Sequence, residues 1–471
     1  MLPLKIRWVF SGLAARRGAA ALERAERAFA RGRLAKAAAV FRQLAEAGNS
    51  DAQWRLGQLY EHGEGVLQSF VDAVRWFRAS ADQGCVPAQA RLGEIYLTGL
   101  RAPATASPSA IARIEASRAH DSLLNRLFPE GLAVRQDPEQ AAIWNGAAAR
   151  SGDAGAQARL GHQYASGLGA ARDLATAEQW FSASAQQGHA AGQLGLGMLY
   201  AGGYGEYGTQ AQALEWCEKA AAQGNCTAKL CLAVLLLYGN GVTRDASRGR
   251  ALLEEAAAAG QPAAMFHLGE LYRRGDDVAA DASQAESWLR RAAARGHVKA
   301  LLSLVRLFTS GLEPDINTAA VLCRQAAELG DGEAQYLLAQ FHLAGRGVPA
   351  DPSEAARWLL KAADQGVTGA YEALGSLYAE GAGLPQDFQE AALWFHRAAA
   401  QGDHNALFHL GTLQFSGLGV PPDPHAAIEW YERAARQGSG RACLRLGVMF
   451  ATGDGVGRSY SAAANRTVQA G

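Results

Sequence analysis

The chain has 471 residues, of which 49% are apolar and only 14 are proline. Its 45 lysine and arginine residues balance its 45 aspartate and glutamate residues, so no net charge draws it to nucleic acid or to an acidic membrane. The six cysteines form no CxxC pair and no recurring spacing, which argues against a disulfide or zinc framework and favours reduced, buried thiols.

The N-terminal segment, residues 1–18, carries several basic residues and no acidic one. Its longest apolar run, Trp8–Phe10, is too short for a signal-peptide core or a membrane-spanning helix. We therefore expect a cytoplasmic protein, or a periplasmic one if the true N-terminus lies elsewhere. Two interpretations stay open: residues 1–17 contact a membrane surface or an acidic partner, or they are a frayed start.

Residues 19–48 have the pattern of a helix, a turn at Gly32 and a second helix, and this hairpin resembles a tetratricopeptide unit. Its turn is shorter than those that follow. An atypical first repeat is expected where a stack of repeats meets water, so we interpret this hairpin as a cap.

From Asp51 onward a single unit recurs, and a glycine closes each copy, mostly at steps of 36 residues. The step from Gly84 to Gly152 is 68, which is one unit plus 32 extra residues. With the first hairpin this gives twelve units. Since stacked units share one continuous core, the pattern predicts an all-α fold, a right-handed superhelical α-solenoid of about twelve helix-turn-helix repeats, in which the hairpin of residues 19–48 caps the repeats of residues 51–471.

Each unit has a small residue and, four places later, a leucine, such as Ala52 and Leu56, which share one face of the first helix. A large residue in the second helix is expected to pack opposite them. Because it recurs once per repeat opposite alanine, we interpret this series as packing rather than as a ligand-stacking ladder. The series is Trp76, Trp144, Trp180, Trp216, Leu252, Trp288, Leu322, Trp358, Trp394 and Trp430.

Aspartates also recur once per repeat, which invites a metal-binding interpretation. Each one opens a second helix, often before proline, and Asp351 is followed by Glu354 in capping-box spacing. Helix capping explains this spacing better than metal ligation. The aspartates are Asp137, Asp173, Asp245, Asp281, Asp315, Asp351, Asp387 and Asp423.

The repeated motif resembles that of the Sel-one-like repeat (SLR) family, whose members are related to tetratricopeptide repeat proteins. Its signature is found here as LGQLYEHGEGV at Leu56–Val66 and LGELYRRGDDV at Leu268–Val278, with further copies toward the C-terminus. The resemblance implies an α-solenoid scaffold or adaptor, often in bacterial signalling or in envelope and exopolysaccharide systems. The cysteine-rich branch of the family carries a disulfide in each repeat. Only Cys443 matches one of those cysteines, and Ala435 occupies its partner position, so a disulfide-stapled secreted protein is not indicated.

No phosphate-binding loop, HExxH motif or paired-thiolate site is found, so the sequence predicts a non-catalytic protein without metal or cofactor. Binding is expected where the first helices line a concave groove and present variable residues to a protein partner. The first units present arginine there and the middle units apolar residues, which predicts acidic partner groups beside an apolar element. The alternative is that the arginines are solvated and neighbouring helices cover the apolar residues. The candidate groove residues are Arg55, Arg91, Arg159, Met198, Val234, Tyr238 and His267.

The insertion at residues 101–130 is the least repeat-like segment. Its first part is rich in proline and small residues, and the remainder has the spacing of an amphipathic helix. Insertions into a solenoid often carry binding, although this one could be a passive elaboration. The candidate contact residues are Ile111, Ile114, Leu123, Leu124, Leu127 and Phe128.

The sequence thus predicts a protein-protein interaction scaffold that binds partners through its groove and its insertion. The alternative function is an envelope-associated scaffold that assists bacterial exopolysaccharide synthesis or export. That alternative requires a targeting segment at a different N-terminus. An enzyme is the least favoured class, because it would need a specific polar residue whose loss abolishes an activity.

Overall fold

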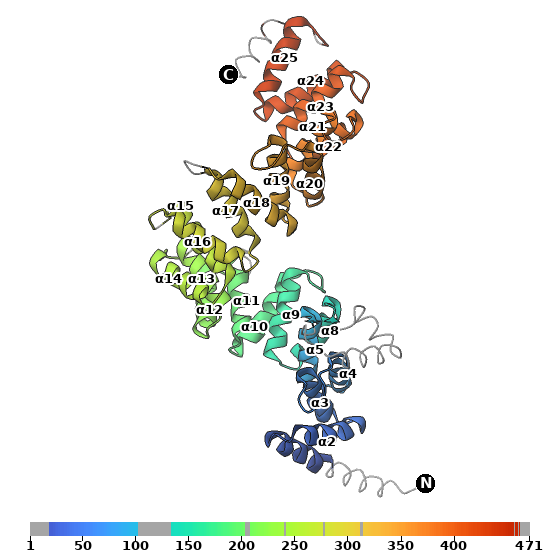
Figure 1. The fold of residues 1–471 in the computed structure, drawn as a ribbon, viewed down its shortest axis with the longest axis vertical. Helices are drawn as coiled ribbons and strands as arrows, with labels where there is room; N and C mark the ends of the chain where they lie inside the picture. The colour runs from blue at the N-terminus through green and yellow to red at the C-terminus, as the bar shows by residue number, and fades with distance from the viewer. Residues whose placement is uncertain are drawn as a thin grey trace, which may run out of the picture. The chain divides into compact units, whose positions relative to one another are not determined.

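The computed structural model describes residues 18–101, 133–202, 208–239, 242–276, 278–310, 314–455, 457–459 and 461. The chain divides into two compact units, Met1–Leu252 and Leu253–Gly471. Within each unit, helices pack as successive antiparallel hairpins, as α3 with α4 and α23 with α24 illustrate (Figure 1). The all-α solenoid expected from the repeat is therefore confirmed.

The first hairpin has one helix over residues 18–30, a turn at residues 31–33, and α2 (Leu34–Glu46). Each later repeat begins with what we call a first helix. The first helices are α3 (Ser50–His62), α5 (Val86–Thr98), α9 (Ala154–Ser166), α11 (Ala190–Ala201), α13 (Cys226–Tyr238), α15 (Pro262–Arg274), α17 (Val298–Ser310), α19 (Gly332–Ala344), α21 (Thr368–Glu380), α23 (His404–Ser416) and α25 (Gly440–Thr452).

A second helix follows each first helix except α25, whose next residues are mostly outside the described part of the chain. The second helices are α4 (Phe70–Ala81), α8 (Pro138–Arg150), α10 (Leu174–Gln186), α12 (Gln210–Ala222), α14 (Ala246–Ala258), α16 (Ala282–Ala293), α18 (Ile316–Glu328), α20 (Pro352–Asp364), α22 (Phe388–Ala400) and α24 (Pro424–Arg436). None of the helices in the described residues is long and apolar enough to span a membrane.

The core of each repeat is built by the small residue and the leucine of the first helix, as expected. Ala52 and Leu56 are both fully buried. The tryptophan of the second helix is only half-buried and packs at the edge of the core, whereas the residue after it is the buried one. Phe77, which follows Trp76, is fully buried. The expectation that the tryptophan packs is confirmed, since Trp76 and Trp144 pack against the buried cluster, but the residue after each is buried more deeply because the helix turns it toward the first helix.

The capping interpretation of the aspartates is confirmed. All eight accept a hydrogen bond from a backbone N–H in the first turn of the helix that they begin. The capping box expected at Asp351 and Glu354 was wrong. The backbone N–H of Asp351 instead donates to the carbonyl of His342 in α19, 3.0 Å away, and the Glu354 carboxylate pairs with Arg357 at 2.7 Å. Because the backbone N–H of Asp351 already donates to His342, it is not available to the Glu354 carboxylate, and the second bond of a capping box does not form.

A hydrogen-bonded glutamine pair, which the sequence reasoning did not foresee, links a buried glutamine of the first helix to an exposed one just after the second helix in several repeats. Gln53 on α3 donates to the carbonyl of Ala45 at 3.0 Å and accepts from Gln83 at 2.7 Å. These bonds satisfy a buried amide that would otherwise lack partners. The same side-chain pairing recurs in Gln187 with Gln157, Gln223 with Gln193, and Gln365 with Gln335.

A short β ladder, also unforeseen, lies at the base of the insertion. Strand β1 (Leu100–Arg101) pairs antiparallel with β2 (Ala133–Val134), so Leu100 lies opposite Val134. Val134 is buried in the core of the first unit. With two residues in each strand, the ladder leaves the all-α class of the fold unchanged. The ladder forms because the two ends of an insertion must meet, and two extended segments satisfy each other's backbone groups.

All six cysteines are free thiols, as expected from their irregular spacing. Their burial is less uniform than expected. Cys217, Cys323 and Cys443 are buried, whereas Cys85, Cys226 and Cys231 are only half-buried.

Candidate functional site

One position of the first helix decides whether the surface of a repeat is filled or hollow. We call it the cover position; it is the residue immediately before the buried leucine. In α23 it is His409, whose ring stacks on Phe395 of the preceding helix with 4.8 Å between centroids and an interplanar angle of 9°. In α9 it is Arg159, whose Nε donates to Asn145 Oδ1 at 2.9 Å. A side chain at this position thus covers the residue that follows the tryptophan.

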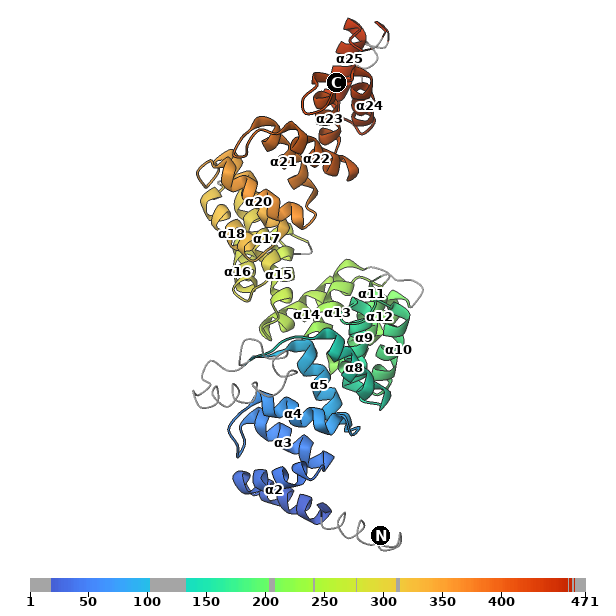
Figure 2. The same cartoon turned by 90° about the vertical axis from the view of Figure 1, so that its right-hand side faces the viewer.

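Gly195 occupies the cover position of α11 and covers nothing. A Cβ at this residue would collide with the ring of Phe181, so α11 approaches α10 more closely than a larger residue would allow. Without a side chain here, a pocket of about 460 Å³ opens between α9 and α11, with Phe181 and Gly195 in its lining. Both helices belong to the first unit, and they remain neighbours in the turned view (Figure 2).

The pocket is mainly apolar and has basic groups in its wall. Leu97 of α5, Leu174 and Phe181 of α10, and Leu194 of α11 supply much of the apolar surface. Among the described residues, the ionisable lining residues are Arg159, His162, Arg172 and His189, and none that lines the pocket is an aspartate or glutamate. Apolar walls with a few converging polar groups are typical of binding sites, and the volume lies in their usual range of about 300–1,000 Å³.

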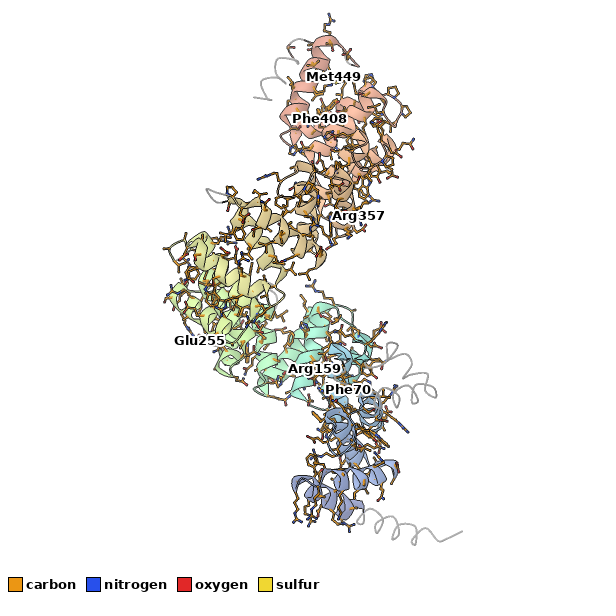
Figure 3. The ribbon with its side chains drawn as sticks, in the orientation of Figure 1. Phe70, Arg159, Glu255, Arg357, Phe408 and Met449 are labelled. Carbon is orange, nitrogen blue, oxygen red and sulfur yellow. The ribbon has the colours of Figure 1, made fainter. Side chains whose placement is uncertain are left out.

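Arg159, labelled in Figure 3, is held by two hydrogen bonds. Besides its bond to Asn145, its Nη2 donates to the carbonyl of Ala90 at 3.0 Å. Its Nη1 makes no hydrogen bond within the described residues and points to the side of Gly155, which lines the pocket. Burial lowers the pKa of Arg159, although Glu94 and Asp153 oppose this effect. A guanidinium stays protonated even so, which leaves a poorly solvated charge in the pocket wall.

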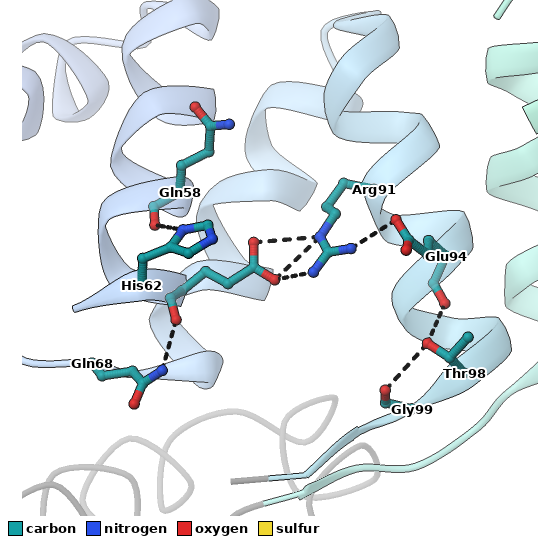
Figure 4. A network of polar contacts seen from close by, with 8 residues as sticks. Gln58, His62, Gln68, Arg91, Glu94, Thr98 and Gly99 are labelled. Atoms are coloured by element: carbon teal, nitrogen blue, oxygen red, sulfur yellow. Dashed lines mark hydrogen bonds and ion pairs between the residues drawn. The ribbon is translucent and has the colours of Figure 1, made fainter. Parts of the chain in front are cut away.

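Arg91 is paired within the protein (Figure 4). Its guanidinium donates to the buried carboxylate of Glu61 on α3 and pairs with Glu94 Oε2 on its own helix at 2.7 Å. These two carboxylates raise the pKa of Arg91 against the opposing effect of burial. A bridge between first helices of successive repeats is a structural role, and it occupies the group that was expected to meet a partner.

Arg55 is also paired but more exposed. Its Nε donates to Glu26 Oε1 at 2.7 Å, and its Nη1 donates to Gln58 Oε1 at 3.2 Å. It lines a smaller hollow of about 160 Å³ together with Glu26 and Glu64. Of the three candidate arginines, the structure therefore brings only Arg159 to the apolar pocket.

Of the remaining groove candidates, only Met198 lines the pocket. Met198 lines the pocket, and 54% of its surface is exposed at the pocket's edge. Tyr238 on α13 is 50% exposed and Val234 is half-buried; neither lines the pocket. His267 belongs to the second unit, where its ring lies edge-on to Phe266 with 5.4 Å between centroids. Burial and the nearby His297 lower its pKa.

Several candidates lie outside the described residues. They are residues 1–17 and the insertion residues Ile111, Ile114, Leu123, Leu124, Leu127 and Phe128. Their proposed contacts remain predictions. Within the described residues, no group of three or more histidine, cysteine, aspartate or glutamate side chains could hold a metal ion.

A second hollow of about 510 Å³ lies among α16, α17 and α18 in the other unit. It opens where Leu322 takes the place of the usual tryptophan, and Arg290 and Glu328 bring opposite charges to it. The pocket beside Gly195 differs because it lies on the first-helix face and its lining charges have one sign.

Sequence reasoning identified Arg159 and Met198 but missed Phe181, Leu97 and Leu174. The signal for Phe181 was present, because it directly follows Trp180 and faces a glycine in the cover position. Leu97 and Leu174 gave no such signal, since their approach to the pocket depends on how successive hairpins stack.

The Sel1 repeat model matches twelve segments of the chain, from residue 50 to residue 465. Two of these segments, 86–108 and 130–153, are halves of one repeat separated by the insertion. A protective antigen of uropathogenic Escherichia coli with an SLR fold is 31% identical and superposes with a TM-score of 0.52; the match covers 92% of this chain and 86% of that one. A Sel1 repeat protein from Oxalobacter formigenes is also 31% identical, with a TM-score of 0.49, over 72% of this chain and 90% of that one. No curated protein matches the chain significantly.

Proposed function

The chain belongs to the Sel1 repeat family, whose members generally act as protein-interaction scaffolds, and from that premise we propose that it binds a partner protein on its first-helix face. The observation that carries this proposal is the pocket between α9 and α11. It lies on the helices that present variable residues, and it exists because one repeat has glycine where others have a covering side chain.

Exposed apolar side chains extend the candidate surface beyond the pocket. Met198 and Tyr238, on two successive first helices, are each about half exposed. Single exposed apolar residues are common on protein surfaces, whereas clusters of them mark interaction sites. The same unit offers a comparison, because Ile143 is 58% exposed on the second helix α8.

The proposal is tested by placing a photoreactive amino acid at Met198, at Tyr238 or at Ile143 in the full-length chain in its own cells. We expect the same cross-linked partner from Met198 and Tyr238 and none from Ile143. Equal cross-linking from all three positions would indicate non-specific contact. Adducts from Ile143 alone would place the interaction on the second-helix face and contradict the proposal.

The insertion is a second proposed contact surface. A protein with residues 101–130 replaced by a short glycine-serine linker should retain the partner that cross-links at Met198 and lose any partner specific to the insertion. If the full set of partners is unchanged, the insertion has no binding role.

The envelope and exopolysaccharide assignment remains an alternative prediction for the same scaffold. Mapping the mature N-terminus of the protein in its own cells separates the two. A processed targeting segment would favour the envelope, whereas an N-terminus at Met1 would favour the cytoplasmic scaffold.

A further inference from the structure

The pocket between α9 and α11 has a shape and a charge that specify more than a general interaction surface. We propose that it anchors an extended, acidic segment of the partner protein by one large apolar side chain, with aspartate or glutamate side chains beside it. This inference rests on the proposed function and assigns the chemistry of the partner. Three observations support it. The pocket has apolar lining residues, its charged lining residues are all basic, and apolar residues are exposed at its edge and on the next first helix.

The floor fits an apolar anchor. Phe181, Leu194 and Leu174 present aromatic and aliphatic surface, and Ala158 and Ala191 keep the sides open. The pocket volume of about 460 Å³ is larger than water-filled gaps between packed helices require. A few large side chains buried in well-packed pockets, tryptophan and tyrosine above all, supply most of the binding energy at protein interfaces.

The wall selects for negative charge. Arg159 and Arg172 line the pocket together with two histidines, and no carboxylate of the described residues lines it. Glu94 and Asp153 both act on the charge of Arg159 but do not line the pocket, and Asp153 caps α9, because its Oδ1 accepts the backbone N–H of Ala156 at 2.7 Å. Arg159 directs its remaining donor, Nη1, to the pocket side of Gly155. A carboxylate placed there would gain a charge-assisted hydrogen bond.

The surroundings favour a protein segment over a small ligand. Met198 is exposed at the edge of the pocket, and Tyr238 is exposed on the next first helix along the stack. A small molecule seated in the pocket would leave both in water, whereas an extended chain crossing successive first helices would cover them. The continuity of apolar surface from α11 to α13 therefore points to a polypeptide.

The contrast with the N-terminal arginines supports the assignment. Arg91 and Arg55 are neutralised by Glu61, Glu94 and Glu26. They offer little net charge to a partner, although they occupy the same position in their repeats as Arg159. Recognition of acidic groups is thus concentrated at one pocket rather than spread along the solenoid.

The test uses the full-length protein and a displayed library of random short peptides. We expect enriched peptides to contain one phenylalanine, tryptophan or leucine and at least two aspartate or glutamate residues close to it. Synthetic versions with both ends blocked should still bind, since the proposed contacts are to side chains rather than to a terminal carboxylate.

Two variants at one exposed position isolate the charge. Met198→Glu and Met198→Lys remove the same apolar side chain but differ in sign. We expect Met198→Glu to weaken binding of the blocked peptide at least about fivefold relative to Met198→Lys, because like charges across an interface repel. Both variants should unfold at the wild-type temperature, since Met198 is mostly exposed.

Each other outcome overturns the inference. Basic or uncharged enriched peptides, or equal binding by the two variants, would contradict the proposed chemistry or the proposed site. Binding that requires a free C-terminus would assign the pocket to chain ends instead. If no peptide is enriched, the pocket does not anchor linear segments. Cross-linking of a partner at Met198 would still support the scaffold in all these cases, so the two proposals fail separately.

Discussion

The face of α9 and α11 in the first unit and the face of α21 and α23 in the second unit are built from the same repeat, yet they differ in what they offer. In α23, His409 covers Phe395 by parallel stacking. In α11, Gly195 leaves Phe181 bordering a pocket. The helices, caps and buried leucines are equivalent in both places. In this comparison, the side chain at the cover position makes the difference between a covered ring and a pocket.

The largest effects are expected from removing the two rings. Phe395→Ala should destabilise the protein by about 3–5 kcal/mol, because the ring is fully buried and its loss leaves a cavity. Phe181→Ala should cost about 3 kcal/mol, at the lower end of that range, because the ring is also buried but borders a pocket. Urea denaturation of both variants measures the difference. Equal losses would mean that Phe181 is packed as well as Phe395 and that the hollow has no energetic consequence.

The next effect concerns the close approach at Gly195. Gly195→Ala should destabilise the protein by about 1–3 kcal/mol, although alanine favours helices, because the added Cβ collides with Phe181. The matched control is Ala373→Gly at the cover position of α21, where only the helix preference is lost, at a cost of about 1 kcal/mol. A stabilised Gly195→Ala protein, measured by thermal unfolding, would disprove the close approach.

A smaller, stabilising effect is expected where the glutamine pairing is incomplete. Gln89 on α5 donates to the carbonyl of Ala81 at 3.1 Å, but its buried Oε1 has no partner among the described residues. Its repeat has Ser151 where other repeats have the donor glutamine. Ser151→Gln should therefore stabilise the protein by about 1 kcal/mol.

Ala259→Gln provides the matched control for that change. Ala259 occupies the same slot as Ser151, but its repeat has Lys229 where the acceptor glutamine would be. We expect no gain there in thermal unfolding experiments. A similar gain in both variants would show that the hydrogen bond to Gln89 is not responsible.

The smallest expected effect is a difference between the two units in how their stability depends on pH. Burial lowers the pKa of His267, His297, His396 and His409, all in the second unit. A histidine whose pKa is lower in the folded state contributes stability that is lost as the pH falls below its unfolded value of about 6.5. Lowering the pH from about 7.5 to about 5.5 should thus destabilise the second unit.

Glu372 opposes this trend. Its carboxylate lies 3.7 Å from His409 Nε2, and burial together with Asp403 raises its pKa. A carboxyl group with a raised pKa adds stability on acidification, so Glu372→Gln should steepen the loss. His409→Phe keeps a ring over Phe395 and should make the loss shallower. Urea midpoints at the two pH values test both variants. If His409→Phe loses as much stability on acidification as the wild type, His409 does not contribute to the pH dependence.

Much of the fold could be predicted from the sequence because it depends on local spacing. The Asp351 cap and the Leu56 core position each depend on residues a few places apart in one repeat. The candidate site was less predictable. Arg159 and Met198 were recognised because they occupy first-helix positions that vary between repeats. Phe181 was missed because Trp180, directly before it, was assigned as the packing residue of that helix.

The sequence by itself determined the repeat, the two helices of each unit, their aspartate caps and the family, since each follows from periodicity and from residues that contact their own neighbours in the chain. Only the tertiary structure decided which residues at the cover position have their side chains paired with other residues of the protein. Arg91 and Arg159 are equivalent in the sequence pattern, yet Glu61 from the preceding repeat neutralises one and Asn145 directs the other to a pocket. That distinction arises between helices of different hairpins, where stacking rather than spacing sets which side chains meet.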